Sequence, residues 1–215
     1  MQELINAAKI AEYLLQIKAI KLQPNDPFTW ASGWKSPIYC DNRVSLSFPA
    51  IRSDIKNALA AKIKELYPEV EAIVGVATAG IPQGALVADA LNLPAAYVRP
   101  EPKSHGRQNQ LEGDLPKGCK VVVLEDLIST GKSSLKAVEV LREMGLEVIG
   151  LAAIFTYGFP IAESNFKQAS CPWFALSDYN VLIDTAIKTG YVRQEDAVKL
   201  AEWRKSPETW GKSDL

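Results

Sequence analysis

Hydrophobic positions along this chain follow two spacings, one typical of helices and one typical of buried strands. Between residues 49 and 66 the apolar side chains Ile51, Ile55, Leu59 and Ile63 recur at helical spacing, which predicts an amphipathic helix. Runs rich in aliphatic and β-branched residues predict strands covered on both faces. These strands are expected over residues 72–78, 94–99, 121–124, 147–157 and 173–179.

Further helices alternate with the strands. They are expected over residues 1–22, 82–91, 131–144 and 181–204. This alternation predicts a doubly wound α/β fold, with a mostly parallel sheet and helices on both faces. Residues 23–43, rich in turn formers and aromatic residues, should form an irregular hood, and residues 100–119 are polar and irregular. We therefore divide the chain into an N-terminal helix and hood segment (1–48), a core (49–180) and a helical tail that packs on the core (181–215).

Composition and charge narrow the classes of protein. Hydrophobic residues make up 47% of the chain and charged residues 23%, which is a globular composition. A net charge of −1 gives no reason to expect a nucleic-acid or membrane surface. The N-terminal residues lack the apolar centre of a signal peptide, and no apolar stretch reaches transmembrane length. Cys40, Cys119 and Cys171 follow no metal-ligand spacing, so we expect reduced thiols in a cytoplasmic protein.

The most informative stretch is residues 121–134, where a strand pattern runs into two adjacent acids and a loop of small residues. Glu125 and Asp126 are expected at the carboxyl end of the strand, where open α/β sheets place their ligands. The backbone N–H groups that follow can converge on an anion at a helix N-terminus. The candidate ligand residues after the acids are Leu127, Ile128, Ser129, Thr130, Gly131, Lys132 and Ser133. The pattern favours a sugar-phosphate site.

Two other interpretations of this stretch were weighed. A strand followed by a capped helix would need only one short polar residue, not two neighbouring acids. The sequence Gly131-Lys132-Ser133 also copies the end of a Walker nucleotide-binding loop. The full Walker pattern requires a glycine at the position held here by Asp126, whose carboxylate would face the phosphates. The sugar-phosphate interpretation is therefore preferred.

Residues 97–113 form a long loop that carries Arg99, Lys103 and His105, the single histidine of the chain. A solvated connection is the plain interpretation of such a loop. Long loops without regular structure inside a compact domain are uncommon, however, and are frequently active-site lids. We expect a lid whose basic side chains act on an anionic group.

The motif at 121–134 resembles the ribose-phosphate-binding motif of the type I phosphoribosyltransferases. Three other segments are similar to the orotate phosphoribosyltransferases of that family, and together the matches cover most of the chain. They are the hood signature FTWASGWKSPIYCDNR (28–43), the small-residue loop GVATAGIP (75–82) and the basic loop around Arg99, Lys103, His105 and Gly106. The resemblance implies transfer of phosphoribose from phosphoribosyl pyrophosphate (PRPP) to orotate, a step of pyrimidine biosynthesis.

The resemblance also implies roles for single residues. Glu125 and Asp126 would hold the ribose hydroxyls, and Asp126, Lys103 and His105 would take part in catalysis. The loop from Leu127 to Ser133 would hold the 5′-phosphate, with Arg99, Lys103 and His105 on the pyrophosphate. The small-residue pyrophosphate loop consists of Ala77, Thr78, Ala79 and Gly80. Orotate would meet Ser129, Tyr39 and Lys35.

The implied cofactor is Mg²⁺ carried on PRPP, with no protein side chain expected to bind the metal directly. The implied assembly is a homodimer that shares its lid. His105 could either donate a proton to the leaving oxygen or act as a hydrogen-bond donor. A scaffold acting on another base, such as a purine, is disfavoured by the hood signature. A PRPP-sensing regulator that binds nucleic acid should show a basic face or a further domain.

The sequence departs from the pattern of one branch of the family. Lysines of that branch are replaced here by Ala31, Ala79 and Pro100, and an arginine that contacts orotate is replaced by Tyr157. The orotate carboxylate must therefore meet another group. Lys35, Arg43 and backbone N–H groups are the candidates, while Phe28 and Trp30 are expected in the core.

Overall fold

The computed structural model describes residues 5–30, 33–99 and 110–211. Within them lies a central sheet with strand order β10-β9-β8-β5-β6-β7, in which β5, β6, β8, β9 and β10 are parallel and the edge strand β7 is antiparallel. The strands are β5 (Ala72–Val76), β6 (Ala95–Val98), β7 (Leu111–Glu112), β8 (Lys120–Ile128), β9 (Glu147–Thr156) and β10 (Trp173–Asp178). The predicted mostly parallel sheet is confirmed.

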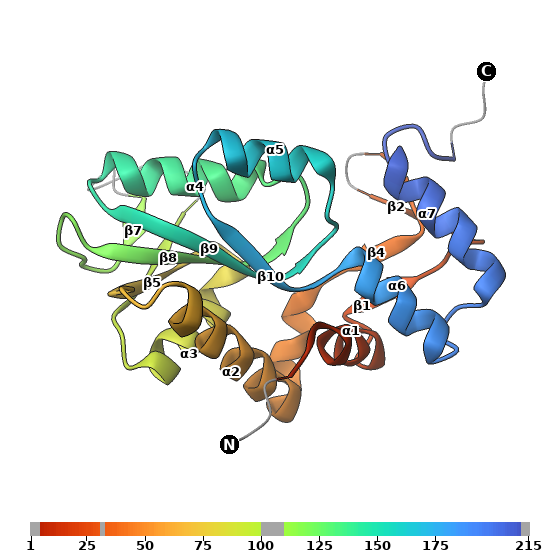
Figure 1. The fold of residues 1–215 in the computed structure, drawn as a ribbon, viewed down its shortest axis with the longest axis horizontal. Helices are drawn as coiled ribbons and strands as arrows, with labels where there is room; N and C mark the ends of the chain where they lie inside the picture. The colour runs from red at the N-terminus through yellow and green to blue at the C-terminus, as the bar shows by residue number, and fades with distance from the viewer. Residues whose placement is uncertain (1–4, 31–32, 100–109, 212–215) are drawn as a thin grey trace.

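Helices cover both faces of this sheet (Figure 1). One face carries α2 (Pro49–Leu66) and α3 (Gly80–Leu91), and the other carries α4 (Lys132–Glu143) and α5 (Pro160–Gln168). Alternate side chains of β8 enter the two cores, with Val122 and Leu124 on one side and Val121 and Val123 on the other. Because both faces are covered, the strand consists of consecutive buried residues, as the sequence pattern predicted.

Beside the sheet lies a second group of elements, drawn at the right of Figure 1. It contains α1 (Ala7–Gln16), β1 (Ile20–Leu22), β2 (Phe28–Thr29), β3 (Lys35–Ser36), β4 (Ile38–Cys40), η1 (Asn42–Ser47), α6 (Tyr179–Lys188), η2 (Gln194–Asp196) and α7 (Ala197–Lys205). The C-terminal helices contact the hood directly. Asn25 donates a hydrogen bond to Asp196 at 3.1 Å, and the rings of Trp30 and Trp203 meet edge to face at 5.7 Å.

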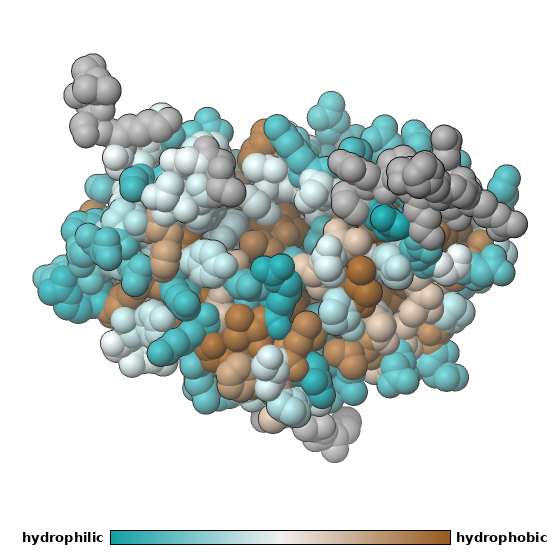
Figure 2. Space-filling model, turned by 180° about the vertical axis from the view of Figure 1, so that it is seen from behind, coloured by the Kyte–Doolittle hydropathy of each residue, from teal (hydrophilic) through white to brown (hydrophobic). Residues whose placement is uncertain are grey.

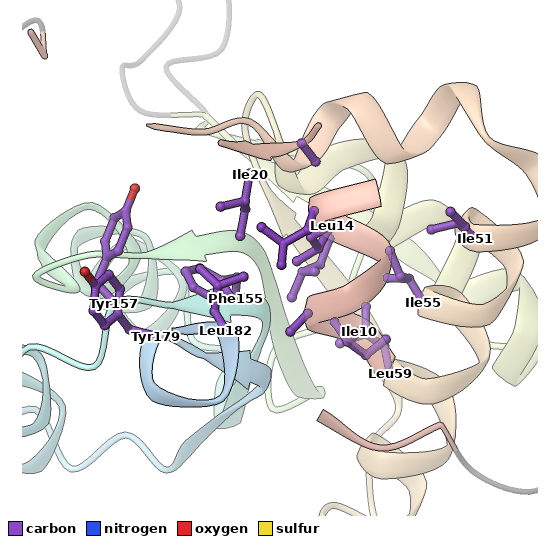
Figure 3. Close-up of a cluster of buried hydrophobic side chains, with 14 of the residues drawn as sticks. Ile10, Leu14, Ile20, Ile51, Ile55, Leu59, Phe155, Tyr157, Tyr179 and Leu182 are labelled. Atoms are coloured by element: carbon purple, nitrogen blue, oxygen red, sulfur yellow. The ribbon is translucent and has the colours of Figure 1, made fainter. Parts of the chain in front are cut away.

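Helix α1 joins this group to the sheet. Figure 3 shows Ile10 and Leu14 of α1 between Ile55 and Leu59 of α2 on one side and Phe155 of β9 on the other. All five side chains are fully buried. Burial of each aliphatic or aromatic side chain contributes about 1.5–3 kcal/mol, so this cluster fixes α1 and the hood that follows it.

Four features of the fold differ from the sequence-based expectation. The helix expected over 1–22 ends at Gln16, because Lys18 adopts a left-handed backbone (φ 58°) and the chain then enters β1. The tail expected as one helix contains α6 and α7, and α5 was missed because its nine residues are mostly polar. The stretch expected to be irregular after residue 100 contains β7, which pairs with β6. In the described parts of the chain no helix has the length and apolar character needed to cross a bilayer.

A stack of glycines lets α3 approach the sheet closely. A Cβ atom on Gly80 would lie 2.3 Å from the carbonyl oxygen of Leu124 in β8, and one on Gly75 would lie 2.6 Å from the carbonyl oxygen of Gly80. These neighbours are backbone atoms, which cannot move aside as a flexible side chain would. The start of α3 therefore rests on the backbones of β5 and β8.

We predict that Gly80→Ala lowers the free energy of unfolding by about 1–3 kcal/mol, because the added methyl group overpacks a rigid contact. The change should also displace the loop that precedes α3. Ala85→Ser, on the exposed side of the same helix, is the control. Urea denaturation of the three proteins measures the effect, and equal midpoints for Gly80→Ala and the wild type would show that the contact relaxes freely.

Candidate active site

The strand order places a topological switch point between β5 and β8. From β5 the chain passes to β6 on one side, whereas β8 lies on the other side and leads on to β9 and β10. The connections that leave the carboxyl ends of β5 and β8 diverge, and open α/β sheets bind ligands in the resulting crevice. The segment 77–80 follows β5, and residues 125–133 come from the end of β8 and the turn after it. The structure thus brings two of the sequence-predicted segments together.

The sequence pattern predicted that the two acids lie at the carboxyl end of the strand. In the structure β8 continues beyond them, so both acids lie inside the strand. The strand continues because Leu127 and Ile128 pair with Phe155 and Thr156 of β9. Neighbouring side chains of a strand point to opposite faces. Accordingly, Glu125 accepts a hydrogen bond from Ser134 of α4 at 3.2 Å, whereas Arg43 and Asp41 of the hood influence the pKa of Asp126. The peptide carbonyl of Asp126 accepts a hydrogen bond from Asn42 of η1 at 2.7 Å.

Burial dominates the electrostatics of both acids. Glu125 is only 6% exposed. Its desolvation, and to a smaller extent the charge of Asp126, raise its pKa from the ordinary 4.5 to about 8. Burial also raises the pKa of Asp126, against lowering contributions from backbone N–H groups and from Arg43. Without ligand, Glu125 is therefore protonated at neutral pH.

This protonation predicts a pH-dependent stability difference between Glu125→Gln and the wild type. Between pH 4.5 and 8 the folded wild type keeps a proton that the unfolded chain releases. Its stability should therefore fall as the pH rises, by about 1.4 kcal/mol per pH unit from this group. Because glutamine does not titrate, the stability of the variant relative to the wild type should increase as the pH rises across this window.

Denaturant unfolding at several pH values between 5 and 8 measures this difference. Glu163→Gln, which changes an exposed acid of α5, is the matched control. Stability differences that stay constant with pH for Glu125→Gln would mean that Glu125 is ionised in the folded protein.

The turn between β8 and α4 is shaped to accept an anion. Gly131 has a left-handed backbone (φ 76°) and precedes the first residue of α4, so the N–H groups of the helix start are open to a ligand. Asn165 of α5 holds the turn by donating to the carbonyl of Thr130 at 2.9 Å. Ile128 is fully buried, so only its backbone could reach a ligand, whereas Lys132 and Ser133 are exposed.

The loop after β5 faces the base of the predicted lid. Ala77 donates its backbone N–H to the carbonyl of Val98 in β6 at 2.9 Å, and the Ala77–Thr78 peptide bond is cis. A cavity of 80 Å³ is lined by Ala77, Arg99 and Ser133, among others. Arg99, directly after β6, forms an ion pair with Glu112 of β7 at 3.4 Å. Lys103 and His105, the other predicted lid residues, lie outside the described residues.

The hood supplies the residues predicted to meet a base. Tyr39 is 41% exposed and its ring lies 5.7 Å from that of Phe28. Lys35 donates to the hydroxyl of Thr29 at 2.9 Å, within the β2–β3 hairpin. Arg43 forms a two-point ion pair with Asp41, so its guanidinium already has an acidic partner.

Tyr157 stands where one branch of the family has an arginine that contacts orotate, and its side chain lies in an apolar, buried environment. It is 3% exposed, and its ring stacks on Phe159 at 5.5 Å and contacts Trp30 and Trp203. Burial raises its pKa well above the ordinary range. Tyr157 is thus a core residue under the hood, and Trp30 is half-buried against the same cluster.

Sequence reasoning missed two polar residues that support the acids, Asn42 and Ser134. Both are 1% exposed and both reach β8 from another element. Their spacing from the acids in the sequence carries no periodic signal. Only the close packing of η1 and α4 on β8 brings them into contact with it.

Comparison with known proteins identifies the class. The model of the phosphoribosyl transferase domain family matches residues 46–175. This segment contains the switch point, both loops and the acids of β8. The chain belongs to the phosphoribosyltransferase family.

Individual relatives narrow the assignment. Orotate phosphoribosyltransferase of Porphyromonas gingivalis is 60% identical over 94% of this chain and 96% of its own length, and that of Listeria innocua is 56% identical over 95% and 98%. The crystal structure of orotate phosphoribosyltransferase from Aeropyrum pernix superposes with a TM-score of 0.73 at 31% identity, covering 86% of this chain and 99% of that one. Within its family the chain groups with the orotate phosphoribosyltransferases, which confirms the resemblance found in the sequence.

Proposed function

We propose that the protein transfers phosphoribose from PRPP to N1 of orotate and releases orotidine 5′-monophosphate (OMP) and pyrophosphate. This is the reaction of the enzymes with which it groups, a step of de novo pyrimidine synthesis. The observation that carries the proposal is the meeting of three segments at one crevice. The acids of β8, the anion-binding turn before α4 and the loop after β5 all lie at the switch point.

The ribose would lie over β8. Carboxylate oxygens accept hydrogen bonds and suit the 2′- and 3′-hydroxyls of ribose. Asp126 is half-buried, and the charges of Arg43 and Asp41 in the hood act on its carboxyl group. We therefore assign it the main contact and place its charge near the carbon that becomes cationic as the bond to pyrophosphate breaks. Glu125 supports it from the α4 side. The 5′-phosphate would sit in the turn 127–133, on the N–H groups that open at the start of α4.

The pyrophosphate would lie between the loop 77–80 and the lid. Arg99 lines the cavity beside Ala77, and Lys103 and His105 follow it in the chain. Basic side chains there would stabilise the negative charge of the leaving group, and a closed lid would exclude water that could hydrolyse the activated sugar. The role of His105, as acid or as hydrogen-bond donor, stays open.

The residues present fit Mg²⁺ that is carried on the substrate. Mg²⁺ prefers oxygen ligands and usually keeps several waters, binding through one or two carboxylates and substrate phosphates. In the crevice the carboxyl groups of Glu125 and Asp126 would face the PRPP that carries the metal, with no direct bond from a protein side chain to the metal required. When bound, the metal would neutralise part of the charge of PRPP, while Asp126 and the basic residues orient the sugar and the leaving group.

Orotate would lie under the hood, between Tyr39 and the turn that contains Ser129. Tyr39 presents a half-exposed ring suited to stacking on a flat pyrimidine. Lys35 lies on the adjacent hairpin. Among the described residues its ammonium group donates a hydrogen bond only to the neutral hydroxyl of Thr29. We therefore favour Lys35 over Arg43 for the orotate carboxylate, because Arg43 would first have to leave Asp41.

The direct test of the proposed function is the decrease of orotate absorbance in the presence of PRPP and Mg²⁺. In that assay Asp126→Asn should lower kcat/KM by about 10- to 100-fold, since a hydrogen bond to a charged group contributes about 1.5–3 kcal/mol. The melting temperature should change little, because the shape of the side chain is kept. Asp89→Asn, an exposed change on α3, is the control. Near-normal turnover of Asp126→Asn would exclude its role at the ribose.

We further propose a cytoplasmic homodimer that shares its lids. Three free cysteines suit a reducing compartment. Figure 2 shows apolar side chains gathered in the lower part of the rear face, and contiguous apolar surface is typical of association sites. In a two-fold dimer each subunit could extend its lid over the site of its partner.

Subunit exchange tests the shared lid. An inactive Asp126→Asn protein is mixed with an inactive Lys103→Ala protein and the chains are allowed to exchange. If Lys103 acts across the interface, a hybrid dimer has one site with both defects and one with neither, so activity should return to about half the wild-type value per hybrid. Absence of recovery despite proven exchange would assign Lys103 to its own subunit, and a monomer in sedimentation would exclude sharing.

A further inference from the structure

Asn42 links the hood to the strand that carries the acids. Its Nδ2 atom donates a hydrogen bond to the peptide carbonyl oxygen of Asp126 at 2.7 Å, although the two residues are 84 positions apart in the chain. Asn42 is 1% exposed, and the bond to the half-buried Asp126 is partly buried. A carbonyl that lost this donor would have limited access to solvent in its place.

The amide of Asn42 is itself held in place. Its Oδ1 atom accepts from the thiol of Cys40 at 3.4 Å, and its backbone carbonyl accepts from the hydroxyl of Ser45 at 2.6 Å. Ser45 in turn lies 3.5 Å from the side-chain amide of Gln83 in α3, the helix that begins with the pyrophosphate loop. Ser45 and Gln83 are buried as well. The orientation of the Asn42 donor is therefore fixed by both the hood and α3.

Asp126 needs this support because of its position in the sheet. Glu125 and Leu127 on either side of it pair with Ala153 and Phe155 of β9. Asp126 lies between them, and side chains bind both of its own peptide groups. Its N–H donates to Oε2 of Glu125 at 3.3 Å, and its carbonyl accepts from Asn42. The direction of its carboxylate thus depends on a hood residue as well as on the sheet.

We propose that Asn42 is a positioning residue, which fixes the peptide of Asp126 so that the carboxylate faces the ribose and which couples the base-binding hood to the ribose-binding strand. This role rests on the proposed function, because it requires a ribose at Asp126. It adds a residue of the hood to the ribose site, whereas the other hood residues were assigned to the base.

A double-mutant cycle tests this role. Asn42→Leu keeps the approximate volume and removes the donor, and Asp126→Asn removes the charge of the carboxylate. The dissociation constant of OMP is measured for the wild type, both single variants and the double variant, because binding remains measurable where turnover is lost. kcat/KM for PRPP is recorded alongside for the active proteins. Asn42→Ser, too short to reach the carbonyl, replaces Asn42→Leu if the latter does not fold.

If Asn42 acts through Asp126, Asn42→Leu should weaken OMP binding by about 10-fold in the wild-type background and by less than about threefold in the Asp126→Asn background, since contacting residues are not additive. Equal losses in the two backgrounds would overturn the inference and leave Asn42 a general structural residue.

Ser177→Ala is the matched control, because Ser177 is 2% exposed and its hydroxyl donates to the carbonyl of Ala7 at 2.9 Å, on β10, which β9 separates from β8. It should lower the melting temperature as Asn42→Leu does, yet leave OMP affinity unchanged. An equal loss of affinity in the control would mean that the effect follows stability and would overturn the positioning role. A wild-type protein that does not consume orotate would overturn the proposed function itself, whereas an active wild type with an additive cycle overturns only the role of Asn42.

Discussion

The structure depends on holding two carboxyl groups inside a strand that is otherwise buried. A carboxylate removed from water is costly unless it is bonded or protonated. Glu125 meets this constraint by keeping its proton to about pH 8 and by accepting a bond from Ser134. Asp126 remains half-exposed to the crevice and depends on Asn42 for its backbone geometry. A cationic or hydroxyl-rich ligand would relieve the remaining cost.

The surrounding fold follows from the same constraint. The carboxyl group of Glu125 takes its polar partner from α4, and the peptide carbonyl of Asp126 takes one from η1, so both elements lie close to β8. The glycine stack at Gly75 and Gly80 brings the start of α3 against β8, which places the loop after β5 beside the acids. The hood is held over them by the α1 cluster and by the contact of Trp30 with Trp203 of α7. The C-terminal helices thus contribute to the site without lining the ribose crevice.

Much of the fold could be predicted from the sequence because periodicity and local chemistry are short-range signals. The helix over residues 49–66 and the strand runs near 72, 95, 147 and 173 agree with α2, β5, β6, β9 and β10. The motif at 121–134 and the hood signature indicate the family to which the relatives assign the chain. The errors lie where local signals are weak, as at Lys18, whose left-handed turn ends α1, and in the polar helix α5.

The sequence by itself determined the order of elements, the two acids, the small-residue loops and the family, since each is written in consecutive residues. Only the tertiary structure decided which groups act on those acids. Ser134 lies nine residues after Glu125 but on a separate element, whereas the bond from Asn42, the burial that raises the pKa of Glu125 and the enclosure of Tyr157 arise from contacts between distant segments. Such contacts depend on how helices and strands pack, and packing geometry has no signature within a single stretch of sequence.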